Sequence, residues 1–456
     1  MTSDNRPRTA RRSFVQQVTA LGVVAAMADI PMARGAQQGK SGAKLQSTVS
    51  VTAATRRDET LLRLGGNGDD FLMTWMAGGR QLVAVQDGVG WFKDPKGEYN
   101  SSLWTLSGDP HDARFENISS YPELLNILYT ENIARYYPFG TLAVDGCIYQ
   151  YLSAQAGPPS GHDLSWIGAK LIYSPDNGET WYNQDGSTPV VWETRKQRSR
   201  RNMVFFQESQ QSFSLPAILQ MGCNYKANRD GYVYVYAPNG VTDSTMNQLV
   251  MFRVRKEHIL HRAAYEYFAG LRPDGGASWS RRIEARAPVH VFPRGWVNRG
   301  SFVAESWVPS VVYNVPLGVY MMASWGVGVA LDGSIFGKPS YLGLWVAPKP
   351  WGPWRQILEE TAWTPGGDEA ARCYMPQIAP KWIAADGKSF WLVWTDYQIK
   401  ATDDCKKAME EWGEALLPNA SLQGTRDEEM RKLGAKARSC QPYYGFNTQR
   451  VDLVVA

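Results

Sequence analysis

The chain has few cysteines and histidines for its length, and this scarcity argues against a metal-centred site. No two of its five cysteines have Cys-x-x-Cys spacing, and its five histidines form no His-Glu-x-x-His pattern. A zinc site is therefore not expected. Cys405 and Cys440 bracket a charged segment, so they are the best candidates for a disulfide in an oxidising compartment. No cofactor is expected, and a structural calcium ion remains an open alternative.

Long apolar runs and a strong net charge are also missing. No segment after the N-terminal region offers the ~20 apolar residues of a membrane-spanning helix, so stable membrane insertion is not expected. The formal net charge is +4, and it falls to about +1 when residues 1–36 are removed. A nearly neutral chain gives no electrostatic reason to expect a nucleic-acid partner.

The first 36 residues have the pattern of an export signal. Arg11-Arg12-Ser13-Phe14 precedes a short apolar run, Val18 to Ala28, which ends in the Ala-x-Ala triplet at residues 26–28. This order is typical of a cleavable signal peptide, and the paired arginines indicate the twin-arginine route. We therefore expect a soluble protein in the periplasm or outside the cell. Residues 37–60, which are small and polar, are interpreted as a linker.

What the sequence has in abundance is aromatic residues and glycine: 18 Trp, 22 Tyr, 15 Phe and 42 Gly. About 18 to 20 short strand-like runs occur with no alternation of strands and helices, which predicts an all-β fold. Four-stranded blades of about 80 residues would give a five-bladed β-propeller over residues 61–456. We expect the last strand to share a blade with N-terminal strands, residues 401–440 to be a short helical insertion, and the protein to be a monomer.

One further motif supports the propeller. The segment SPDNGETW matches the Asp-box pattern with Ser174, Asp176, Gly178, Thr180 and Trp181. Such a box is a tight turn between outer blade strands, in which the polar side chains bind backbone groups. It predicts a structural role and no chemistry.

The candidate site lies in residues 65–92, GGNGDDFLMTWMAGGRQLVAVQDGVGWF. Two short strands, residues 71–75 and 81–85, are joined by a glycine-rich turn. An antiparallel hairpin returns the chain to its starting level, so Asp69 or Asp70 should lie near Asp87. Two carboxyl groups at one end of a hairpin are the minimal equipment for glycoside hydrolysis. The alternative is that these aspartates only shape turns.

These and other segments, including DGYVYVY, RVRKEHILHRAAYEYFAG, VPSVVYNVPLGVYMM and WVAPKPWGPW, resemble a family of secreted five-bladed propellers grouped as a domain of unknown function. Some members are endo-acting D-arabinanases. The resemblance implies a glycoside hydrolase-like site in the central funnel, with acidic catalysts on the first blade. It places them at Asp70 and Asp87, with Asp69 as the competitor of Asp70, because related sequences often read Asp-Asn at this pair. Sialidase propellers need several Asp-boxes and an arginine triad, which this chain lacks.

The sequence thus predicts an exported glycoside hydrolase that acts on a neutral polysaccharide, such as an arabinan. The alternative is a propeller that binds carbohydrate without cleaving it. Residues at strand ends of later blades are candidates for holding sugar hydroxyls, together with Asp69: Asn224, Arg229, Asp230, Tyr313, Asn314 and Asp396. The expected partner is a polysaccharide or oligosaccharide.

Overall fold

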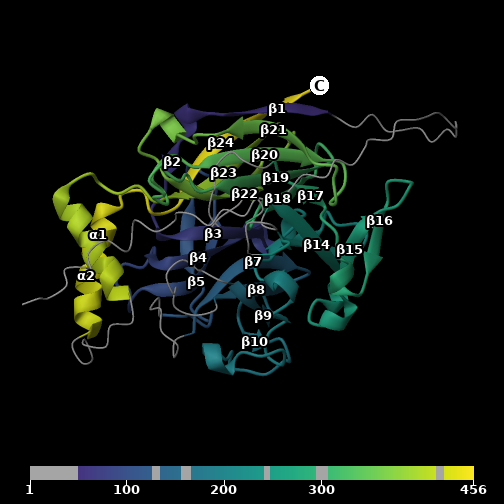
Figure 1. Ribbon diagram of the computed structural model, residues 1–456, viewed down its shortest axis with the longest axis horizontal. Coiled ribbons are helices and arrows are strands. Elements are labelled where there is room, and N and C mark those ends of the chain that lie inside the picture. Colours follow the sequence, from purple (N-terminus) through teal and green to yellow (C-terminus); the bar gives the residue numbers. More distant parts are fainter. Residues whose placement is uncertain (1–49, 126–133, 156–165, 241–246, 294–306, 417–425) are drawn as a thin grey trace, which may run out of the picture.

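Five antiparallel sheets form the body of the described structure, a computed structural model (Figure 1). The structure describes residues 50–125, 134–155, 166–240, 247–293, 307–416 and 426–456. The predicted signal peptide lies outside these residues. The sheets are the blades of a five-bladed β-propeller, which confirms the predicted all-β class.

The blades follow one another along the chain. Blade 1 contains β3 (Asn67–Trp75), β4 (Gln81–Gly90), β5 (Tyr99–Ser107) and β6 (Arg114–Asn117). Blade 2 contains β7 (Tyr136–Val144), β8 (Cys147–Gln155), β9 (Trp166–Ser174) and β10 (Tyr182–Asn183), with β11 (Phe205–Phe206) beside β9. Blade 3 contains β12 (Ala217–Ile218), β13 (Tyr232–Pro238), β14 (Gln248–Arg255), β15 (Glu266–Leu271) and β16 (Ala277–Ser280), with β17 (His290–Val291) beside β14.

The last two blades complete the ring. Blade 4 contains β18 (Ser310–Asn314), β19 (Val319–Gly326), β20 (Tyr341–Ala347) and β21 (Arg355–Glu360). Blade 5 contains β22 (Cys373–Ile383), β23 (Ser389–Asp396), β24 (Asn447–Val455) and β1 (Val51–Arg56), with β2 (Leu62–Arg63) also on β24. Blade 5 therefore joins the two ends of the described chain.

The N-terminal strand β1 corrects one boundary of the sequence analysis. Residues 51–56 fall in the expected linker, but they pair with residues 451–455 of β24. Val51 and Ala54 are buried and the residues between and after them are more exposed, with a register shift between residues 51 and 53. Small and polar composition concealed this strand, because an outermost strand needs to bury only one face. The expectation that the last strand shares a blade with N-terminal strands is confirmed.

The first strands of the blades surround the propeller axis. Neighbouring strands in the ring β3, β7, β12, β18 and β22 contact one another, and β22 returns to β3. Side chains from all five blades leave a cavity of only about 20 Å³ between them, roughly the room that one water molecule needs. The axis is therefore packed. We call the end where the N-terminal ends of β3, β7 and β22 meet the mouth of the propeller.

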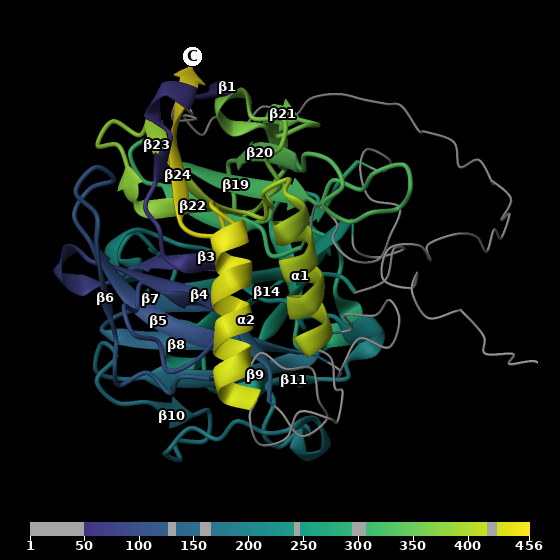
Figure 2. The same ribbon diagram turned by 90° about the vertical axis from the view of Figure 1, so that its left-hand side faces the viewer.

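The predicted helical insertion consists of two helices, α1 (Asp403–Leu416) and α2 (Arg426–Cys440), between β23 and β24. They lie side by side against one flank of the propeller (Figure 2). A disulfide joins Cys405 to Cys440, as predicted. Arg438 of α2 forms an ion pair with Glu98, near the start of β5. In the described part of the chain, no helix has the length and apolar character needed to cross a membrane.

The Asp-box forms the turn between β9 and β10 and has the predicted structural role. Asp176 accepts hydrogen bonds from the backbone N–H of Thr180 at 2.8 Å and of Glu179 at 3.1 Å, while Ser174 Oγ accepts one from Gly178 N–H at 2.8 Å. Trp181 is buried beneath the turn and meets Tyr121 edge to face. These bonds satisfy the backbone of a tight hairpin.

Candidate functional site

The β3–β4 hairpin brings the predicted aspartates together at the mouth. β3 and β4 pair antiparallel, with Asp69 opposite Gln86, the residue before Asp87. The Tyr444 hydroxyl lies 2.9 Å from Asp69 Oδ2 and 3.2 Å from the carbonyl oxygen of Asp87. The two acidic segments therefore share one end of the hairpin, as the sequence predicted.

The register of the inner strands distinguishes Asp69 from Asp70. The pairs Asp69–Gln86 and Leu72–Ala84 enclose two unpaired residues on β3 and one on β4, which is a β-bulge. Asp70 lies in this bulge with φ of +54°. Its left-handed backbone would suit asparagine or glycine equally well. Asp69 is the last paired residue before the bulge.

The same bulge occurs in blade 5. There Tyr374 pairs with Thr395 and Gln377 with Val393, and Met375 has φ of +51°. Met375 thus corresponds to Asp70, and Tyr374 corresponds to Asp69. Because the apolar, buried Met375 adopts the same conformation, the left-handed backbone at Asp70 is a structural feature of the bulge and does not require an aspartate. Asp69 and Tyr374 hold equivalent positions in blades 1 and 5, and the Tyr374 hydroxyl donates a hydrogen bond to Asp69 at the mouth.

Asp69 is held by two tyrosines from blade 5. Its Oδ2 accepts hydrogen bonds from the hydroxyls of Tyr374 at 2.7 Å and Tyr444 at 2.9 Å. Burial raises the pKa of Asp69 well above its ordinary value, and the nearby Asp87 carboxylate raises it further. The tyrosine hydrogen bonds oppose this rise in pKa but do not cancel it. The protonated form of Asp69 is therefore favoured.

Asp70 is the most enclosed of the three aspartates, with 5% of its surface exposed. Its Oδ1 has no hydrogen-bond partner among the described residues. Burial raises its pKa well above the ordinary value, and the charges of Asp69 and Asp87 add to the effect. A carboxyl group so enclosed is poorly placed to meet a polymeric substrate.

Asp87 has a different environment, since it faces a cation. Its Oδ2 lies 3.1 Å from Arg135 Nη2, and the Arg135 side chain is only 6% exposed. Asn100 Nδ2 donates to Asp87 Oδ1 at 3.1 Å, and the Tyr137 hydroxyl donates to Oδ2 at 3.3 Å. The Asp87 side chain retains 25% exposure. The mouth thus holds a carboxylate paired with arginine next to a carboxyl group that favours its protonated form.

Five of the predicted sugar-contacting residues lie at the opposite end of the propeller. Asn224 accepts a hydrogen bond from Gly146, in the turn after β7, and its neighbour Cys223 contacts the carbonyl of Met76, after β3. Because β7 and β3 begin at the mouth, these turns are at the far end. The other four occupy turns or strand ends of blades 3 and 4 at the same far end: Arg229, Asp230, Tyr313 and Asn314.

The polar groups of these residues serve the fold at that end. Asp230 accepts hydrogen bonds from Tyr232 N–H and from the Tyr234 hydroxyl, and Asn314 donates to the carbonyl of Gly387. The sequence pattern indicates that a residue lies at a strand end, but it does not indicate whether that end faces the mouth or the opposite end of the propeller. The structure therefore does not bring these residues to Asp69.

Asp396 is at the mouth end of blade 5, but it is fully buried. Its Oδ1 accepts hydrogen bonds from the backbone N–H of Arg372 at 2.8 Å and of Gln398 at 3.2 Å. Burial raises the pKa of Asp396. Its carboxyl group thus fixes the backbone at Arg372 and at Gln398 and is not available to a sugar hydroxyl.

Sequence reasoning missed the residues that surround the carboxyl groups. Four of them come from blades 2 and 5, Asn100 comes from β5 of blade 1, and none was singled out as a site residue: Asn100, Arg135, Tyr137, Tyr374 and Tyr444. Tyr137 and Tyr374 begin inner strands. The start of each blade's first strand was therefore the available indication, once the mouth was assigned to that end.

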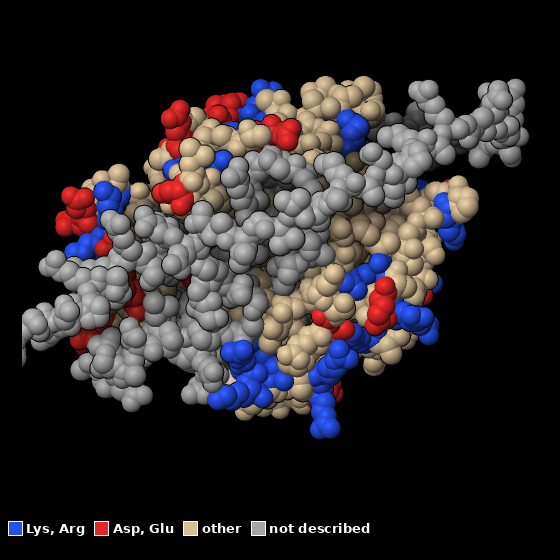
Figure 3. Space-filling model, in the orientation of Figure 1, with Lys and Arg blue, Asp and Glu red and all other residues tan. Residues whose placement is uncertain are grey.

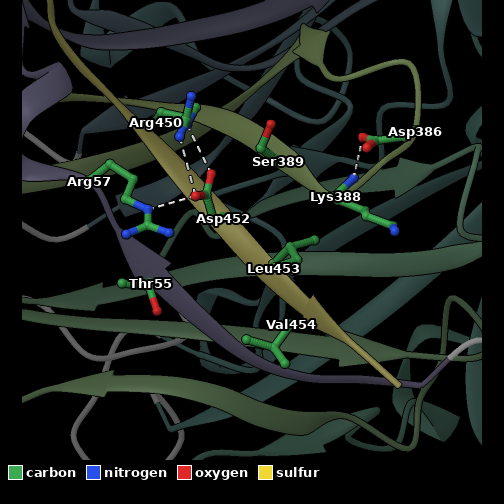
Figure 4. Close-up of a pocket in the computed structure, with 9 residues that line it drawn as sticks. All are labelled: Thr55, Arg57, Asp386, Lys388, Ser389, Arg450, Asp452, Leu453 and Val454. Atoms are coloured by element: carbon green, nitrogen blue, oxygen red, sulfur yellow. Dashed lines mark hydrogen bonds and ion pairs between the residues drawn. The ribbon is translucent and has the colours of Figure 1, made fainter.

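A wide, open pocket of about 440 Å³ lies away from the aspartates, on the outer strands of blade 5 (Figure 4). It includes Lys388 and Asp386 in the turn that follows β22 at the end opposite the mouth. Arg57 and Arg450 converge on Asp452, with Nε–O distances of 2.6 and 2.9 Å. Its charged groups are largely paired with one another, and no aromatic ring lines it. Among the described residues, no group of His, Cys, Asp and Glu could hold a metal ion.

The fold and the mouth define a five-bladed β-propeller that presents three neighbouring aspartates at one end of its axis. The chain matches the domain-of-unknown-function family DUF4185 over residues 58–401. The match covers well over half of the chain, so the protein belongs to this family. No curated protein matches it.

Several solved propellers are similar to this chain. The native arabinanase Arb43A of Bacillus subtilis is 14% identical, with 75% of this chain and 94% of that chain covered and a TM-score of 0.37. The α-L-arabinofuranosidase of Podospora anserina, in complex with cellotriose, is 11% identical, with coverages of 89% and 95% and a TM-score of 0.37. A GH43_1 enzyme of Xanthomonas citri, in complex with xylotriose, is 11% identical, with coverages of 87% and 92% and a TM-score of 0.39. At such low similarity, function has to be argued from this chain's own residues.

Proposed function

We propose that the protein is an exported glycoside hydrolase that acts on a neutral polysaccharide, with an arabinan as the first substrate to test. The observation that carries this proposal is the contrast between Asp69 and Asp87. One carboxyl group favours its protonated form, and the other faces a buried arginine at the same mouth. Two carboxyl groups whose environments differ in this way match the acid and base roles of glycoside hydrolysis.

In this mechanism Asp69 is the general acid. It gives its proton to the glycosidic oxygen as the bond to the anomeric carbon breaks. Asp87 either attacks the anomeric carbon or takes a proton from the water that attacks it. Tyr374 and Tyr444 orient Asp69, and Arg135 and Asn100 orient Asp87. The sequence analysis placed the two catalysts at Asp70 and Asp87, with Asp69 as the competitor of Asp70; the bulge and the enclosure of Asp70 support the choice of Asp69.

The surface is compatible with an uncharged substrate. On the face shown in Figure 3, both signs are present among the described residues: basic side chains gather along the lower part and acidic ones lie mostly above, so neither sign covers the face. An extended field of one sign would instead attract a charged polymer. The nearly neutral charge of the chain without residues 1–36 points the same way.

The test is incubation of the protein, without residues 1–36, with neutral polysaccharides including arabinans, xylans and β-glucans, followed by measurement of new reducing ends. We expect one class to be cleaved by the native protein and not by Asp87→Asn. Asp176→Asn is the matched control, because this Asp-box carboxylate lies in an outer turn of blade 2. Binding without cleavage by the native protein would favour the non-catalytic propeller and would contradict the proposal.

A further inference from the structure

Four aromatic rings form a continuous wall beside Asp69. Tyr374 and Tyr444 donate their hydroxyls to Asp69 Oδ2. The Phe336 ring centroid lies 5.3 Å from that of Tyr374, and Tyr397 lies 5.1 Å from Phe336 and 6.0 Å from Tyr444. The four rings thus form a connected series in which two members touch the carboxyl group.

The outer members of this wall are only partly buried. Tyr374 is 7% exposed, whereas Phe336, Tyr397 and Tyr444 are of intermediate exposure. Their positions at the edge of the core could be explained by packing alone, since they also contact buried apolar residues. What distinguishes these rings from core packing is their partial exposure together with their connection to the carboxyl group of Asp69 through Tyr374 and Tyr444.

Phe336 has φ of +57°, a left-handed backbone that the buried Phe213 and Tyr225 also adopt, and its place in the wall is fixed by a hydrogen bond. The guanidinium Nε of Arg372 donates a hydrogen bond of 2.7 Å to the carbonyl of Phe336. Arg372 also binds both Asp396 and Tyr397 through its backbone. The buried carboxyl of Asp396 therefore ties the segments that carry Phe336 and Tyr397 into one rigid unit.

From this geometry we infer that Phe336, Tyr397 and Tyr444 form a subsite for one sugar ring of a neutral polysaccharide, next to the bond that Asp69 would protonate. The apolar face of a sugar ring packs on aromatic planes, while its hydroxyls remain free for polar partners. A wall preorganised by Arg372 and Asp396 loses little entropy when the sugar binds. The inference deepens the proposed function, and it rests on that function only for the placement of the active site at Asp69 and Asp87.

The test separates binding from cleavage. In the Asp87→Asn background, the dissociation constants of arabinohexaose, xylohexaose and cellohexaose are measured by titration calorimetry for Phe336→Ala and Tyr397→Ala. We expect each change to weaken the tightest of these ligands about tenfold. Phe336→Tyr keeps the ring and should bind within about twofold of the background. Ile335→Ala is the matched control, because this residue is 47% exposed in the same loop and outside the aromatic wall.

The same variants with Asp87 intact are assayed on the polysaccharide that the native protein cleaves. If the subsite binds ground state and transition state alike, removing one of its rings should raise KM about tenfold and leave kcat within about twofold. Cleavage with unchanged KM in Phe336→Ala and Tyr397→Ala would overturn the subsite and leave the hydrolase standing. Binding that these variants weaken, in a protein that cleaves nothing, would uphold the subsite and refute hydrolysis. Failure of all three hexasaccharides to bind at millimolar concentration would overturn the subsite.

Discussion

Replacing Asp69 and Asp70 separately by asparagine tests the central assignment. The amide introduced by Asp69→Asn keeps an oxygen that can accept from Tyr374 or Tyr444, but it cannot supply a proton. We expect Asp69→Asn to lower kcat by about 10²–10⁴, the usual effect of losing a general acid. Asp70→Asn should keep the rate within about tenfold, because asparagine tolerates the left-handed backbone of the bulge.

Stability gives a second readout for the same pair. The pKa of Asp70 is raised in the folded protein, so above about pH 4 the native state binds a proton that the unfolded chain has released. The free energy of unfolding of the native protein therefore falls as pH rises from about 4 toward the raised pKa of Asp70. The fall is at most about 1.4 kcal/mol per pH unit for one carboxyl group with a raised pKa. Asp70→Asn removes one contribution and should flatten the curve.

The assays are polysaccharide cleavage at saturating substrate and denaturant unfolding at pH steps from about 4 to 7. Asp176→Asn serves as a control that should lose about 1 kcal/mol of stability and keep its rate per folded molecule. If Asp70→Asn abolished cleavage and Asp69→Asn did not, the assignment from the bulge register would be refuted. If both kept full rate, neither Asp69 nor Asp70 would be the acid catalyst.

Three further predictions concern export, the insertion and ring closure. Changing Arg11-Arg12 to Lys-Lys should retain the protein in the cell, as measured by fractionation, since the twin-arginine pathway reads this pair; unchanged export would indicate another route. Replacing Cys405 and Cys440 by serine should leave a cooperatively melting propeller with reduced cleavage, because Tyr444 follows this disulfide by four residues; unchanged kinetics would show that β24 alone positions Tyr444. Removing residues 1–56 should abolish cooperative thermal unfolding followed by circular dichroism, because the outer edge of β24 loses its partner; a sharp transition would contradict this.

Local patterns were sufficient for the features that depend on a single stretch of chain. The β3–β4 hairpin, the Asp-box turn and the disulfide around α1 and α2 each follow from residues that lie together or bracket one segment. The closeness of Asp69 and Asp87 follows from the hairpin alone.

The remainder of the site depends on how blades meet. Arg135 reaches Asp87 from blade 2, and Tyr374 and Tyr444 reach Asp69 from blade 5. No local pattern states which strands are innermost or which of their ends is the mouth. The choice between Asp69 and Asp70 required the register on both sides of the bulge, which comes from pairing and not from residue type.

The pairing of β1 with β24 also constrains the order of events during synthesis. Ser50 and Ala456 exchange backbone hydrogen bonds, so the first and last described residues meet at one edge of blade 5. While the chain is being made, the strand that appears first has no partner until the residues of β24 are released. Its unpaired edge is open to other chains for that whole period. A ribosome that stops shortly before residue 447 would therefore leave an open ring with two unprotected strands, which is a species prone to aggregation.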